Sequence, residues 1–140
     1  MSFALREHTA DVAVEASGES LNAVFGAVAD GMAAAMCDEV PDTGGERFDL
    51  SVAAESREAL LFDYLDELIY ERDVRGVLPV DNEAAVSDRS SDGGEWTLSA
   101  TARGIALEAV AARDLKAVTY SEMDVSETAD GWHAYVVFDV

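Results

Sequence analysis

The segment that decides the fold spans residues 56–76 and reads SREALLFDYLDELIYERDVRG. Its apolar residues recur at intervals of three and four positions, which is typical of a helix with a wide apolar stripe on one side. Ser56 is a suitable N-cap, Glu58 places negative charge in the first turn, and Gly76 ends the pattern. The sequence therefore predicts a long amphipathic helix in the middle of the chain.

A second helical pattern lies upstream, between residues 21 and 36. Its apolar residues have the same spacing, and Ser20 directly before them is a candidate N-cap. Gly26 and Gly31 interrupt the pattern, and we interpret them as positions of close packing. We therefore predict a second helix that ends near Met36.

Most of the remaining chain alternates between apolar and polar residues, which is typical of strands. The segments with this alternation are 10–16, 47–53, 78–86, 96–102, 125–128 and 132–138. Turn residues at 90–94 and at 129–131 predict two hairpins among them. The order of elements predicts one α+β domain over residues 1–140, with two main helices packed on one face of a mainly antiparallel sheet.

The charge of the chain excludes some partners. With 29 acidic and 9 basic residues among 140, the formal net charge is -20, although the 49% hydrophobic content is that of an ordinary globular protein. Such a surface repels phosphates, so binding to nucleic acid or to an anionic membrane through a basic patch is not expected. Because the acidity extends from Glu7 to Asp139 and is not confined to a tail, it indicates adaptation to a salt-rich cytoplasm.

Cysteine and histidine are scarce. Cys37 is the only cysteine, so an intramolecular disulfide or a Cys-x-x-Cys zinc site is excluded, and a reduced, cytoplasmic location fits. The N-terminal residues lack the pattern of a signal peptide, and no apolar run approaches 18 residues. His8 and His133 are the only histidines, and no nucleophile elbow or phosphate loop is present.

The abundant carboxylates are compatible with a metal site that uses oxygen ligands. Asp11 interrupts the start of a predicted strand, and Asp139 in the last strand precedes the terminal carboxylate of Val140. If these two strands are neighbours, three negative groups converge, and Ca²⁺ or Mg²⁺ would neutralise them. The alternative for each aspartate is a solvated surface carboxylate.

Lysine gives a further indication, because Lys116 is the only one in the chain. Strand alternation places Lys116, Val118 and Tyr120 on one face, so the lysine and the tyrosine hydroxyl could border one site. A compact ammonium group differs from the arginine guanidinium in hydration and geometry, which favours a specific role. The alternatives are chance and a cross-strand ion pair.

These residues lie in segments that resemble the archease family. The segments follow the order of that family over nearly the whole chain; they are EHTADV at 7–12 with GESLNAVF at 18–25, ALLFDYLDELI at 59–69, KAVTY at 116–120 and VVFDV at 136–140. Together with the acidity, the resemblance implies a halophilic archaeon as the source.

The resemblance implies a protein cofactor that activates the RtcB-type RNA ligase, promoting its guanylylation and multiple turnover in tRNA exon joining. It also implies a metal site at Asp11, Asp139 and Val140 and a functional role for Lys116, and His8 matches the first of the family's segments. The second reading is a chaperone-like module that modulates the solubility or specificity of a tRNA-modifying enzyme. An independent metal-dependent enzyme is disfavoured, because no general base or nucleophile stands out in the sequence.

Overall fold

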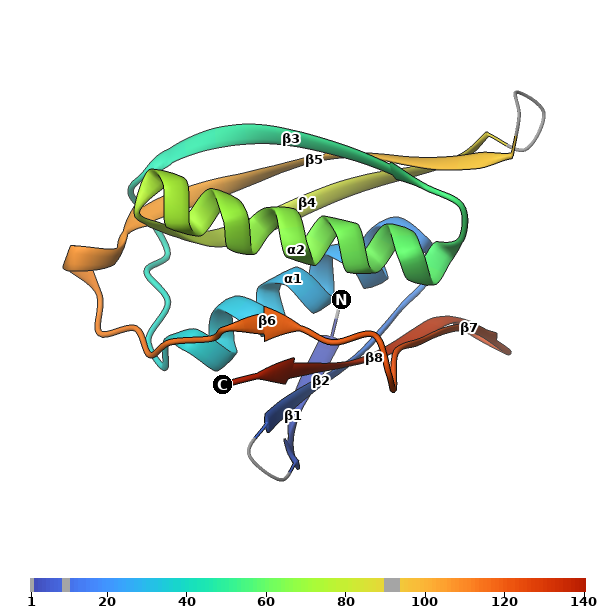
Figure 1. Ribbon diagram of the computed structural model, residues 1–140, viewed down its shortest axis with the longest axis horizontal. Coiled ribbons are helices and arrows are strands. Elements are labelled where there is room, and N and C mark those ends of the chain that lie inside the picture. The colour runs from blue at the N-terminus through green and yellow to red at the C-terminus, as the bar shows by residue number, and fades with distance from the viewer. Residues whose placement is uncertain (1, 9–10, 90–93) are drawn as a thin grey trace.

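Both predicted helices form, and their capping residues explain where they begin and end. The computed structural model describes residues 2–8, 11–89 and 94–140 (Figure 1). Helix α1 spans Leu21–Met36, and the hydroxyl of Ser20 accepts a hydrogen bond from its first turn at 3.1 Å. Helix α2 spans Arg57–Arg75, with Ser56 as its N-cap. Gly76 ends α2 with a φ of 66°, a left-handed conformation that glycine adopts without strain.

The strands form two antiparallel sheets instead of the single sheet expected. The five-stranded sheet has the order β1 (Ser2–His8), β2 (Asp11–Gly18), β8 (Gly131–Asp139) and β6 (Ala117–Val118), and β7 (Asp124–Thr128) also pairs with β8. The three-stranded sheet has the order β3 (Glu46–Ala54), β5 (Glu95–Ala106) and β4 (Val77–Arg89). The α+β prediction is confirmed, but alternation along a strand does not reveal which strands pair.

One strand was not predicted, and another is shorter than its alternation indicates. The unpredicted strand is β1, and within the alternating residues 116–120 only Ala117 and Val118 form a strand, β6. Of the predicted turn at 90–94, residues 90–93 lie outside the described part of the chain. A short 3₁₀ helix at Leu107–Ala109 follows β5.

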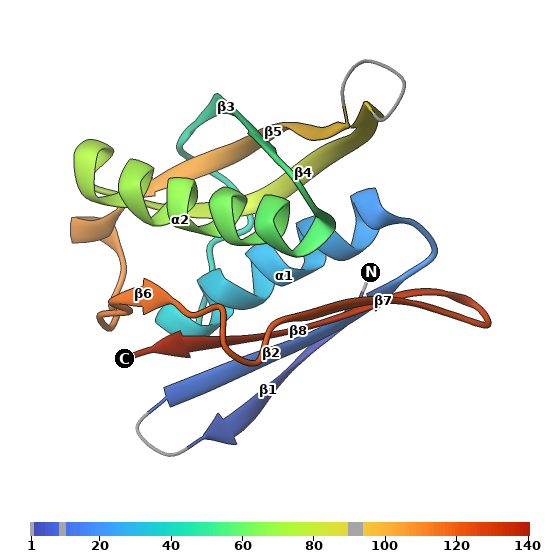
Figure 2. The same ribbon diagram turned by 45° about the vertical axis from the view of Figure 1, so that its right-hand side comes forward.

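The two helices lie between the two sheets (Figures 1 and 2). Helix α1 packs on β2 and β4, and α2 packs on β3 and β5 on one side and on β6 on the other. Eleven of the 16 residues of α1 are buried, so this helix is covered on nearly every side. A Cβ added at Gly31 would lie 2.5 Å from Cγ1 of Val14, which confirms close packing at that glycine.

Helix α1 also covers the free edge of β4. The side chain of Asn22 accepts a hydrogen bond from the Val86 N–H at 2.7 Å, and Asp30 Oδ1 accepts one from the Asn82 N–H at 2.9 Å. Eight residues of helix rise about 12 Å. Four residues of strand cover about 13 Å, so the two pairs match in spacing. Helix side chains therefore take two N–H groups of this edge that another strand could otherwise bind.

Among the described residues, no helix is both long and apolar enough to cross a membrane.

Candidate metal centre and the neighbouring lysine

The sheet register brings the two candidate aspartates together. Strands β2 and β8 are neighbours, and Asp11 lies directly opposite Asp139. Residues directly opposite on antiparallel strands share a face, with Cβ atoms about 5 Å apart. The condition on which the sequence-based metal hypothesis depended, that the two strands are neighbours, is therefore met.

The aspartate pair faces away from the helices. The next pair in the register, Val12 and Phe138, packs into the core, so alternation turns the carboxylates to the outer face of the sheet. Asp11 is partly buried and Asp139 is exposed. In the same row, His8 lies opposite Asp11 on β1, although its side chain is not among those described.

Two carboxylates in this position suit a hard cation. Like charges directly opposite on neighbouring strands destabilise a sheet, and a divalent cation between them removes that repulsion. Val140 follows Asp139 and is 49% exposed. Within the described part of the chain, no three His, Cys, Asp or Glu side chains are grouped closely enough to hold a metal ion. The register thus brings together two side-chain carboxylates, and the terminal carboxylate of Val140 stays a prediction as the third group.

Lys116 is joined to this centre through its backbone. Its N–H donates a hydrogen bond to the carbonyl oxygen of Asp139 at 2.9 Å, and Thr119 N–H donates to Val137 at 2.9 Å. Ala117 lies between them and opposite Asp139 in the register. The segment that carries the lysine therefore runs along the strand that carries Asp139.

The Lys116 side chain is exposed and forms no ion pair with any described residue. It differs in this from the arginines. Each of the six arginine side chains that the structure describes has a partner in an ion pair, a hydrogen bond or a ring contact: Arg47, Arg57, Arg72, Arg75, Arg103 and Arg113. A cross-strand ion pair thus does not account for the lysine within the described residues.

Tyr120 lies beyond the end of β6 and is 49% exposed. Its ring packs on Phe62 of α2, with 5.5 Å between the ring centroids. No hydrogen bond joins Tyr120 to Lys116. That the lysine and the tyrosine hydroxyl border one site stays a prediction.

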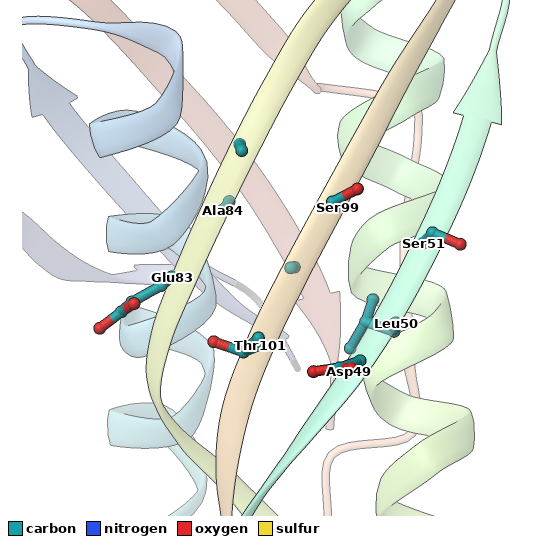
Figure 3. A pocket seen from close by; sticks show the side chains of 9 residues that line it. Asp49, Leu50, Ser51, Glu83, Ala84, Ser99 and Thr101 are labelled. Atoms are coloured by element: carbon teal, nitrogen blue, oxygen red, sulfur yellow. The ribbon is translucent and has the colours of Figure 1, made fainter.

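The larger pockets lie elsewhere. One of about 640 Å³ opens on the outer face of the three-stranded sheet (Figure 3). Asp49, Thr101 and Glu83 form a row across its three strands, and the Thr101 hydroxyl accepts a hydrogen bond from Arg47 at 2.7 Å. None of the residues that line this pocket belongs to the candidate metal centre.

Two helices between two antiparallel sheets, with an aspartate pair on the neighbouring strands β2 and β8, define a small α+β protein with a candidate cation site at one end of its five-stranded sheet. Residues 3–140 match the Archease protein family, and the chain belongs to that family. The resemblance that the sequence motifs carry is thereby confirmed.

Similar proteins agree with this assignment. The archease of Methanosarcina acetivorans is 34% identical over 96% of this chain and 92% of its own length. The archease of Thermococcus gammatolerans is 33% identical over 96% of this chain and 95% of its own. Protein 1598 of Methanobacterium thermoautotrophicum, known from a solution structure, superposes with a TM-score of 0.84 at 26% identity, covering 99% of this chain and 98% of that one.

A crystal structure of the archease of Thermotoga maritima, described as a possible chaperone, shares the fold. Its TM-score is 0.62 at 24% identity, over 96% of this chain and 94% of that one.

Proposed function

We propose that this protein activates an RtcB-type RNA ligase in the joining of tRNA exons, through a divalent cation held at one end of its five-stranded sheet. The cation ligands are the carboxylates of Asp11, Asp139 and Val140, and Lys116 acts beside them. The observation that supports this most directly is the register in which Asp11 faces Asp139 while the Lys116 N–H binds the Asp139 carbonyl. Membership of the archease family supports the choice of partner.

Calcium or magnesium suits the donor set. Both prefer carboxylate and carbonyl oxygens, whereas zinc sites use the thiolates and imidazoles that are scarce in this chain. When bound, the cation would neutralise the facing carboxylates and hold the ends of β2 and β8 together. Lys116 then supplies a positive charge near this end of the sheet, because its side chain has no ion-pair partner among the described residues.

The acidity of the chain favours a protein as the direct partner. A surface with a formal net charge of -20 repels RNA phosphates, so the protein would act by contacting the ligase. The same acidity supports a salt-rich cytoplasm as its location.

The test is ligation of RNA ends by the cognate ligase under multiple-turnover conditions, with and without this protein. We expect substoichiometric amounts to raise both the number of turnovers and the fraction of guanylylated ligase. Unchanged turnover and guanylylation would overturn the proposal.

The second candidate function is a chaperone-like activity, and the description of the Thermotoga maritima archease favours it. A chaperone of this kind acts by binding its client, so stoichiometric amounts would be needed and soluble ligase would increase. The dose response in the ligation assay therefore separates the two candidates.

A further inference from the structure

Arg72 of α2 is the only charged side chain that is buried among the described residues, at 8% exposed. Burying a guanidinium group is costly unless its N–H groups find acceptors. Its Nη1 donates to the carbonyl oxygen of Leu115 at 2.7 Å and lies 3.3 Å from Sδ of Met36. Its Nε donates to the carboxylate of Asp73 at 2.9 Å. The buried charge is thus directed at the chain segment that carries the lysine.

Leu115 directly precedes Lys116, so the carbonyl that Arg72 binds and the N–H that binds Asp139 belong to one peptide group. A trans peptide group is planar, with its C=O and N–H pointing in opposite directions. Arg72 on one side and the Asp139 carbonyl on the other therefore hold this plane at both ends. The orientation of that plane sets the direction in which the backbone enters the Cα atom of Lys116.

Strand pairing next to the lysine is short. Strand β6 begins one residue later and has only two residues, Ala117 and Val118. A hydrogen bond from a charged donor is stronger than one between neutral groups, and a buried carbonyl without a donor is costly. The bond from Arg72 is therefore well suited to fix a segment that has so few strand contacts.

The geometry points to Arg72 as a positioning residue that holds the Leu115–Lys116 peptide group against the carbonyl oxygen of Asp139, and so sets the direction in which the lysine side chain leaves the backbone. This inference rests on the proposed function for the part that concerns ligase activation. The alternative is that Arg72 only joins α2 to the neighbouring segment and contributes to stability.

The first measurement is amide hydrogen exchange, which needs no ligase. Arg72→Met keeps much of the side-chain length and removes the donors, and Arg72→Lys keeps a donor. We expect the Lys116 N–H to exchange roughly tenfold faster or more in Arg72→Met, and at an intermediate rate in Arg72→Lys. The N–H of Val136, in the middle of β8, is the internal reference and should keep its rate. An unchanged Lys116 rate in both variants would overturn the inference.

Arg103→Met is the matched control. Arg103 also uses its guanidinium to bind backbone carbonyls, those of Pro41 and Gly44, but in a different loop. We expect this variant to lose stability without faster exchange at Lys116. If it accelerates Lys116 as much as Arg72→Met does, the effect is general loosening and the inference fails. If Arg72→Met does not fold, Arg72→Lys is compared with the control in its place.

The second measurement is a double-mutant cycle in the ligation assay. Arg72→Met should lower activation about tenfold in the parent protein and have no further effect in a Lys116→Ala background. Equal losses in both backgrounds would show that Arg72 does not act through the lysine. If Lys116→Ala itself leaves activation unchanged, the proposed function of the lysine fails, while the exchange measurement still decides whether Arg72 holds its backbone.

Discussion

At the scale of single residues, Lys116 is the side chain whose removal should separate function from stability. It is exposed and forms no ion pair with a described residue, so Lys116→Ala should change the free energy of unfolding by less than about 0.5 kcal/mol. We expect the same variant to lose at least about tenfold in ligase activation, which corresponds to 1.4 kcal/mol. Lys116→Arg should be partly active, because a planar guanidinium does not replace a compact ammonium group. Full activation by the alanine variant would show that Lys116 is a surface residue without a role in activation.

If Asp11 and Asp139 bind Ca²⁺, added Ca²⁺ should raise the melting temperature of the protein. A ligand that binds only the folded state at a hundred times its dissociation constant stabilises it by about 2.7 kcal/mol. Asp11→Asn and Asp139→Asn should each abolish most of this shift, because each removes a charged ligand. Asp130→Asn, an exposed aspartate in the β7–β8 turn, is the control and should keep it.

Residues appended after Val140 would turn its carboxylate into an amide carbonyl and should also reduce the Ca²⁺ shift. An equal shift in the parent, the two variants and the extended protein would show that the site lies elsewhere.

The sequence predicted the proximity of Asp11 and Asp139 but not the role of Arg72. The difference lies in which contacts each residue type makes visible in a sequence pattern. Asp11 and Asp139 stand out because carboxylates interrupt apolar strand patterns. Arg72 lies in the last turn of α2, where basic residues commonly interact with the helix dipole at the surface. Only packing against Met36 and Leu115 shows that it is buried, and nothing local in the sequence encodes those contacts.

At the scale of elements, local signals were reliable and long-range pairing was not. The caps at Ser20, Ser56 and Gly76 fixed both helices, because each depends on residues within one turn. The split into two sheets depends on contacts between strands distant in sequence, such as β2 with β8. Strand alternation reports which face is buried and leaves the neighbour undetermined.

The hydrogen bonds between Asp30 of α1 and Asn82 of β4 predict how Asp30 variants change the free energy of unfolding. Burial raises the pKa of Asp30, although hydrogen bonds from the backbone and side chain of Asn82 oppose that shift. Asp30→Ala leaves the Asn82 N–H without its acceptor and should lower the free energy of unfolding by about 1–3 kcal/mol. Asp30→Asn keeps an oxygen acceptor and removes the buried charge, so it should equal or exceed the parent at neutral pH.

The pH dependence of stability tests whether charge burial is the reason why Asp30→Asn equals or exceeds the parent. A raised pKa in the folded state means that proton binding favours folding, so the cost of the Asp30 charge is present above the folded-state pKa and absent below the ordinary value of about 3.9. Denaturation by urea at several pH values should therefore show the advantage of Asp30→Asn over the parent shrinking as the pH falls. An advantage that does not change with pH would mean that charge burial is not its source.

At the scale of the whole molecule, the basic side chains are too few to offset the acidic surface. Five of the six arginines whose side chains are described pair with a carboxylate: Arg47, Arg72, Arg75, Arg103 and Arg113. Carboxylates outnumber basic groups 29 to 9, so most have no cation with which to pair. Repulsion among them opposes the compact state, and its strength depends on the salt concentration.

The last prediction follows from this repulsion. The Debye length is about 10 Å at 0.1 M salt and about 3 Å at 1 M, so molar KCl screens carboxylates that repel one another in dilute buffer. We expect the melting temperature to rise by several degrees over this range, since about 1 kcal/mol of stability corresponds to roughly 4 °C for a chain of this size.

Salt also strengthens apolar burial, and a charge-reduced variant separates the two causes. The triple variant Asp42→Asn, Asp66→Asn and Asp130→Asn removes three exposed carboxylates and should melt higher in dilute buffer and respond less to KCl. An identical salt response in parent and variant would assign the effect to apolar burial, and a melting temperature that is constant with salt would remove the case for salt adaptation.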